Sequence, residues 1–111
     1  MNIMDRQQVM DEAVRRLVEY FRPERIYLFG STARGEASPD SDLDFLVVVP
    51  DETPSRRFWD VYKETAGLDI PVDVKVIRRR DCEARRDWLM SLAAIALREG
   101  KILYDAHAEA A

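Results

Sequence analysis

Two aspartates, two residues apart, are the side chains of this sequence best suited to carry out chemistry. Asp42 and Asp44 stand at the start of a run, Leu43 to Val49, that is otherwise apolar. Because side chains alternate across a β-strand, both carboxylates would point to one side while Leu43 points to the other. Two like charges this close resist burial and raise one another's pKa. A divalent cation relieves that conflict, and hard oxygen ligands of this kind suit Mg²⁺.

A third carboxylate could join this pair from a later strand. Asp73 interrupts a β-branched run over residues 72–77 and faces away from the valines of that run. If this run lies beside residues 43–49, three acids converge. Three clustered acids can hold two metal ions about 4 Å apart, which is the arrangement used in phosphoryl and nucleotidyl transfer. Lys75 is expected on the same side of its strand as Asp73.

Gly30 and Ser31 have the properties of a phosphate-binding turn. Gly30 lets the backbone approach a ligand closely, and Ser31 adds a hydroxyl where a short helix over residues 31–36 is expected to begin. Arg34, one turn further on, is placed either to neutralise pyrophosphate or to pair with a surface acid. The Gly-Ser pair alone is more often an ordinary turn, and Asp42-x-Asp44 alone is more often a solvated strand start. Their combination favours a metal and nucleotide site.

The elements that must position these residues are predicted from periodicity. Apolar residues recur at helical spacing in three segments, residues 5–21, 55–66 and 81–98. Asp5 and Gln8 form the pattern of a capping box at the start of the first helix. Runs rich in apolar and β-branched residues predict four strands, residues 25–29, 43–49, 72–77 and 101–104. This order predicts an α/β (α+β) fold, a small mixed β-sheet flanked by helices.

Composition limits the classes of protein to consider. The 111 residues are 47% apolar and 34% charged, and we expect one domain over residues 1–111 with a loose tail over 105–111. No apolar run is long enough to cross a bilayer or to form a signal peptide, so we expect a cytoplasmic protein with no membrane partner. The net charge of −4 argues against extensive nucleic-acid binding. Cys82 is the only cysteine, which excludes an internal disulfide. Trp59 and Trp88 are interpreted as packing or interface anchors.

The spacing of the chemical residues resembles that of a known superfamily. Gly30-Ser31, ten further residues, Asp42-x-Asp44 and a later Asp73 together resemble the DNA-polymerase-β-like nucleotidyltransferases. The whole chain is similar to a minimal nucleotidyltransferase (MNT), the antitoxin of HEPN/MNT toxin–antitoxin pairs. The resemblance implies the polymerase-β-like fold. It also implies that Gly30 and Ser31 bind phosphates, that Asp42 and Asp44 ligate two Mg²⁺ ions, and that Asp73 shares metal binding and helps deprotonate the acceptor.

The resemblance further implies a reaction and a partner. The expected reaction is Mg²⁺-dependent transfer of AMP from ATP to a tyrosine hydroxyl of a HEPN-domain ribonuclease toxin. Larger relatives carry an added domain that holds the acceptor, and this chain has no residues left for one, so we expect a partner protein to supply that surface. Two alternatives stay open. One is a non-catalytic antitoxin that neutralises its toxin by direct complex formation, and the other is a transferase acting on a small molecule.

Overall fold

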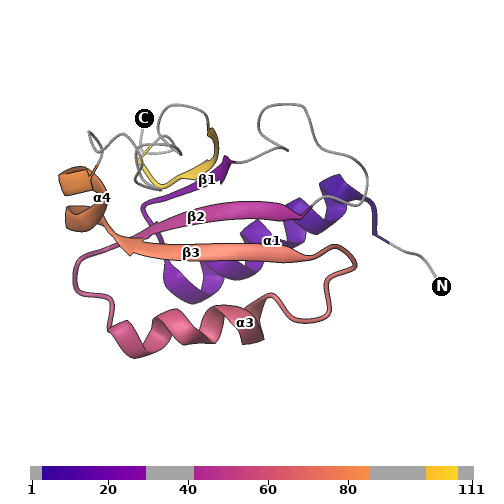
Figure 1. The fold of residues 1–111 in the computed structure, drawn as a ribbon, viewed down its shortest axis with the longest axis horizontal. Coiled ribbons are helices and arrows are strands. Elements are labelled where there is room, and N and C mark those ends of the chain that lie inside the picture. Colours follow the sequence, from indigo (N-terminus) through magenta and orange to yellow (C-terminus); the bar gives the residue numbers. More distant parts are fainter. Residues whose placement is uncertain (1–3, 30–41, 86–99, 108–111) are drawn as a thin grey trace.

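A single mixed sheet organises the molecule. The computed structural model describes residues 4–29, 42–85 and 100–107 of the chain. Its elements, in order, are α1 (Arg6–Phe21), β1 (Arg25–Phe29), β2 (Leu43–Val49), the 3-10 helix η1 (Ser55–Asp60), α3 (Val61–Glu64), β3 (Val72–Arg78), α4 (Arg79–Arg85) and β4 (Lys101–Asp105). The strands lie in the order β3-β2-β1-β4, as Figure 1 shows in part. The predicted fold class is confirmed.

The four predicted strands are confirmed, with small differences at their ends. β1 and β2 have the predicted bounds, whereas β3 and β4 each run one residue further than predicted. Asp105 therefore belongs to the sheet and not to a loose tail, because it pairs with Arg25 of β1 and its carboxylate lies 3.2 Å from the guanidinium of that residue. The backbone N–H of Ala106 then donates to the carbonyl of Glu24 at 2.9 Å.

α1 begins at the predicted capping box. The Asp5 carboxylate accepts a hydrogen bond from the backbone N–H of Gln8 at 2.8 Å, and the Gln8 side chain accepts one from the backbone N–H of Asp5 at 2.9 Å. Each bond satisfies a donor that a helix start leaves without an intrahelical partner. The buried side of α1 follows a spacing of four residues along the helix, with Val9, Ala13, Leu17 and Phe21 facing the sheet.

Removing this cap is expected to destabilise the protein modestly. Asp5→Ala leaves the N–H of Gln8 without its acceptor, and we expect the free energy of unfolding to fall by about 1 kcal/mol. Asp5→Asn is the matched control, since asparagine caps helices about as well as aspartate, and its effect should be small. Urea unfolding followed by circular dichroism measures both values. Equal losses in the two variants would show that the charge of Asp5, and not the cap, matters.

The core lies mainly between α1 and one face of the sheet. Side chains of β2 alternate, so that Leu43, Phe45, Val47 and Val49 pack toward α1, while Leu46 and Val48 pack on the opposite face against Tyr27 and Cys82. β2 is thus covered on both faces along most of its length, as its apolar sequence predicts. η1 and α3 join the α1 side through Phe58 and Val61, and α4 joins the other side through Cys82.

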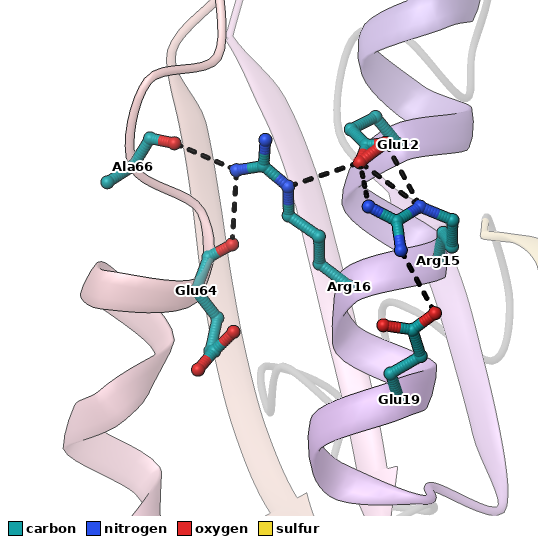
Figure 2. A network of polar contacts seen from close by, with 6 residues as sticks. All are labelled: Glu12, Arg15, Arg16, Glu19, Glu64 and Ala66. Atoms are coloured by element: carbon teal, nitrogen blue, oxygen red, sulfur yellow. Dashed lines mark hydrogen bonds and ion pairs between the residues drawn. The ribbon is translucent and has the colours of Figure 1, made fainter.

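The segment predicted as one helix over residues 55–66 is instead a 3-10 helix followed by one α-helical turn. It begins after Pro54 without a side-chain cap, and short uncapped helix starts often adopt the tighter 3-10 geometry. Tertiary contacts hold its end. Figure 2 shows Arg16 of α1, which donates to the carbonyls of Ala66 at 2.8 Å and Glu64 at 3.4 Å and also pairs with Glu12.

The remaining helix predictions are only partly covered by the structure. α4 begins at Arg79, two residues before the predicted start of the helix over 81–98. Residues 86–98 and the helix predicted over 31–36 lie outside the described residues. Among the helices in the described ranges, none combines the length and the apolar character needed to cross a membrane.

Candidate active site

Asp44 and Asp73 are direct neighbours on adjacent strands. β2 and β3 run parallel, and their register places Asp44 opposite Asp73, Leu46 opposite Lys75 and Val48 opposite Ile77. Neighbouring strands lie about 4.8 Å apart, so two side chains on the same face of paired positions lie side by side. Both carboxylates are on the face away from α1, because the alternate residues of both strands pack into the α1 side of the core. The condition stated for the two strands, that they lie side by side, is therefore met.

Asp42 lies just before β2 and is exposed. The strand start is fixed next to it, because the backbone N–H of Leu43 donates to the carbonyl of Pro71 at 3.0 Å. β1 reaches the same end of the sheet, since its last residue, Phe29, pairs with Asp44. The chain therefore leaves β1 beside the acids. Gly30, Ser31 and Arg34, the predicted phosphate-binding residues, follow at once and lie outside the described residues.

The electrostatics of Asp44 reflect this crowding. Burial raises the pKa of its carboxyl, and the neighbouring charges of Asp73 and then Asp42 raise it further, while the ammonium of Lys75 acts in the opposite direction. Lys75 lies on the same face as Asp73, as predicted, and its Nζ is 3.3 Å from the Asp73 carboxylate. Both members of this pair are about half exposed, at 53% and 49% of their side-chain area, so water and salt screen their attraction.

The chemistry of these donors fits a hard divalent cation. Burial and the charges of two other carboxylates outweigh the Lys75 ammonium in their effect on the pKa of Asp44, so a further positive charge would stabilise its ionised form. Mg²⁺ is usually bound by one or two carboxylates together with waters and substrate phosphates. Within residues 4–29, 42–85 and 100–107, no three His, Cys, Asp or Glu side chains are grouped so that they could hold a metal ion. The strand register pairs Asp44 with Asp73, and the described residues do not bring Asp42 into one group with them.

The raised pKa of Asp44 predicts a pH-dependent loss of stability. The folded state holds this proton more tightly than the unfolded state, so the free energy of unfolding falls as pH rises from 3.8 through the folded pKa and stays reduced above it. Asp44→Asn removes this penalty. Without divalent cations, we expect the Tm of Asp44→Asn to exceed that of the wild type by more at about pH 7 than at about pH 4.

Thermal unfolding at the two pH values measures this difference. Glu52→Gln is the matched control, because it removes one negative charge from an exposed position. A difference between Asp44→Asn and the wild type that is the same at both pH values would contradict the raised pKa.

A cavity that the sequence did not indicate lies at the opposite end of the same sheet face. It has a volume of about 310 Å³ and is lined by residues of β1, β2 and α4 and by His107. Its two arginines already have acidic partners, since Arg25 lies 3.2 Å from Asp105, and Arg79 lies 3.2 Å from Glu83. Sequence reasoning assigned Cys82 and His107 no function. No short spacing links these residues, so no local pattern could have brought them together.

Comparison with known proteins agrees with this geometry. Residues 10–95 match the family model of the nucleotidyltransferase domain. Among curated proteins, none matches significantly. A chain of a toxin–antitoxin crystal structure with AMP-PNP is similar at 22% identity and a TM-score of 0.60, covering 89% of this chain and 75% of that one. A chain of the complex between a tri-AMPylated Shewanella oneidensis HEPN toxin and an MNT antitoxin is similar at 20% identity and a TM-score of 0.58, covering 94% and 76%.

The two solved structures share the fold of this chain, and the family match covers the segment that contains all the predicted site residues. The mixed sheet, the parallel pairing of β2 with β3 and the in-register acids agree with a polymerase-β-like nucleotidyltransferase. The chain belongs to the nucleotidyltransferase domain family.

Proposed function

We propose that this nucleotidyltransferase is an antitoxin that transfers AMP from ATP to a tyrosine hydroxyl of a HEPN-domain ribonuclease toxin. The observation that carries the proposal is the in-register pair of Asp44 and Asp73, with the pKa of Asp44 raised by burial and then by both neighbouring acids. Similar folds occur in a toxin–antitoxin structure with AMP-PNP and in a complex whose HEPN toxin is tri-AMPylated. The reaction needs ATP and Mg²⁺, which are abundant in the cytoplasm, and we place the protein there.

The proposed roles follow the resemblance to the nucleotidyltransferases stated above. Asp42, Asp44 and Asp73 would hold two Mg²⁺ ions, which neutralise charge on the triphosphate when bound. Gly30 and Ser31 would bind the phosphates, and Arg34 would balance the charge of pyrophosphate. Gly30, Ser31 and Arg34 lie outside the described residues.

The transfer step exchanges one bond to phosphorus for another. The tyrosine oxygen forms a bond to the α-phosphorus of ATP, the bond from that phosphorus to the bridging oxygen breaks, and pyrophosphate leaves with the electron pair. Asp73 accepts the proton of the tyrosine hydroxyl. This carboxylate is accessible to an acceptor, since about half of its side-chain area is exposed, and the Lys75 ammonium at 3.3 Å helps to orient it.

Mass spectrometry of both proteins tests the proposal. The protein is incubated with Mg-ATP and with the product of the neighbouring gene, which we expect to be a HEPN-domain protein, and the mass of each component is then measured. We expect AMP-sized additions on the HEPN-domain protein with the wild type and none with the double variant Asp42→Asn, Asp44→Asn. Glu52→Gln serves as the control for lost charge. An absence of additions with the wild type, or unchanged additions with the double variant, contradicts the proposal.

One observation favours a non-catalytic antitoxin as the second candidate. The Asp73 carboxylate already has a counter-charge in Lys75, so the site has part of its balance without a metal ion. Masking of the toxin by complex formation alone would then suffice. In that case the double variant should still protect cells from the toxin, and protection should follow the ratio of the two proteins and not the supply of ATP.

A further inference from the structure

The outer face of η1 and α3 carries two aromatic and two cationic side chains that contact water. Trp59 is 75% exposed and Tyr62 is 71% exposed. Arg56 and Lys63 are also exposed, and in the described part of the chain their side chains make no hydrogen bond or ion pair. We call these four residues, Arg56, Trp59, Tyr62 and Lys63, the aromatic–basic face. Trp59 is therefore a surface residue. Of the two roles expected for it, packing in the core and anchoring an interface, only the interface role fits this exposure.

Helix geometry brings these four residues together. Arg56 and Trp59 are three residues apart in η1, and side chains at this spacing lie directly above one another in a 3-10 helix. Tyr62 and Lys63 follow in α3, three and four residues after Trp59, which places them on the same side one turn later. The aromatic–basic face is therefore one continuous strip, with its two rings between the two cations in sequence.

The backbone that presents this strip is held from behind. Arg57 donates to the carbonyl of Tyr20 at 2.7 Å, and its guanidinium lies over the ring of that residue. Arg78 donates to the Ser55 hydroxyl at 2.7 Å, and its guanidinium lies over the ring of Phe58 at 5.0 Å. Arg16 holds the far end, as described above. Because the segment is already ordered, a partner that binds it incurs little further loss of conformational entropy.

The side chains of the aromatic–basic face indicate which kind of partner it would bind. Tryptophan, tyrosine and arginine are the residues most enriched among those that carry protein–protein binding energy. Asp60, which lies between the two cations in sequence, accepts a hydrogen bond from the Tyr20 hydroxyl, and neither cation forms an ion pair in the described residues, so carboxylates of a partner could pair with them. Two cations on a protein of net charge −4 are too few for nucleic acid, whose binding requires many phosphate contacts. A second copy bound about a two-fold axis would place like charges together at the interface.

We propose that the aromatic–basic face docks a partner protein through a surface that has an apolar centre rimmed by carboxylates. The partner is the HEPN-domain acceptor, so the inference rests on the proposed function in this one respect. The face lies on the α1 side of the sheet, whereas Asp44 and Asp73 lie on the other side. η1 contacts β3 through Arg78, and β3 is an edge strand, so a bound partner reaches the acids around a single strand.

Isothermal titration calorimetry without nucleotide tests the docking by itself. The probe is the purified product of the neighbouring gene, which we expect to be a HEPN-domain protein. Trp59→Ala should weaken binding about thirtyfold and Lys63→Glu about tenfold. Ile102→Ala and Lys101→Glu are the matched controls, because they make the same kinds of change at exposed positions of β4, the opposite edge of the sheet. Both controls should bind like the wild type, and added salt should weaken wild-type binding more than that of Lys63→Glu.

The outcomes separate this inference from the proposed function. AMP additions by the wild type together with unchanged binding of Trp59→Ala and Lys63→Glu would overturn the docking face and leave the transfer reaction intact. Weakened binding of both variants without any AMP addition by the wild type would support the docking face and refute the reaction. Absence of wild-type binding would overturn the docking face, and so would wild-type binding that does not respond to salt. Thermal unfolding of each variant confirms that a loss of binding is not a loss of fold.

Discussion

Asp44→Asn is expected to lower the rate of the proposed AMP transfer by about 10³-fold while leaving the protein folded. Asp44 is the most buried of the three acids, and burial together with the charges of Asp73 and Asp42 raises the pKa of its carboxyl. An amide has nearly the same shape but donates no charge to a bound cation. Electrostatic stabilisation of this kind contributes several kcal/mol to a transition state, which corresponds to about 10³ in rate. Single-turnover transfer of labelled AMP to the HEPN-domain protein measures the loss.

The same substitution should not weaken the fold, and this distinguishes lost chemistry from lost structure. Since burial and like charges raise the pKa of Asp44, its ionised form is unfavourable in the folded protein, and the amide removes that cost. Glu52→Gln should leave both rate and stability close to those of the wild type. A variant Asp44→Asn that transfers AMP at the wild-type rate would refute the assignment of Asp44, and a variant that unfolds would refute the account of its electrostatics.

Phe45→Ala is expected to have the largest effect on stability. Phe45 is fully buried, and it follows Asp44 in β2 but points to the α1 side, among Leu17, Ile26 and the valines of β3. Replacing a buried phenylalanine with alanine usually costs about 3–5 kcal/mol, through lost burial and the cavity that is left. Domains of this size have about 5–15 kcal/mol in total. Urea unfolding should therefore show a midpoint far below that of the wild type.

Ile102→Ala provides the control for the removal of an apolar side chain. Ile102 lies on β4 with 53% of its surface exposed, so its truncation should change the free energy of unfolding by no more than about 0.5 kcal/mol. Comparable losses in the two variants would mean that the core does not lie between α1 and the sheet. A loss of stability in Phe45→Ala alone would show that β2 is stabilised mainly by packing on the α1 side of the sheet, whereas Asp44 and Asp73 lie on the other face.

The strands and the first helix were predictable because their signals are local. The capping pair Asp5 and Gln8 and the apolar run of β2 are each readable within a few residues. The pairing of Asp44 with Asp73 was conditional on two strands being neighbours, and no local pattern fixes that. The family resemblance favoured it, and the register of β2 and β3 confirmed it.

The features that escaped prediction depend on distant residues. The segment after Pro54 has the apolar spacing of a helix, but its actual course is set by Arg57 and Arg78, which contact Tyr20 and Phe58. The partners of an arginine are not readable from its sequence neighbours. The same holds for Asp105, which joins β4 because Arg25 of β1 lies beside it. The roles of Gly30, Ser31 and Arg34 stay predictions, since these residues lie outside the described ranges.

The parallel pairing of β2 with β3 has a consequence for how the site forms. Antiparallel neighbours such as β1 and β2 need only a reversal of the chain between them. Parallel strands require a crossover from one end of the sheet to the other, and between β2 and β3 this crossover is the segment that includes η1 and α3. Contacts between residues far apart in sequence form at the cost of closing a long loop and slow the folding of a chain. Asp44 and Asp73 come together only when that crossover is complete. A nascent or partly unfolded chain therefore has no paired acids, and the pair arises together with the finished sheet.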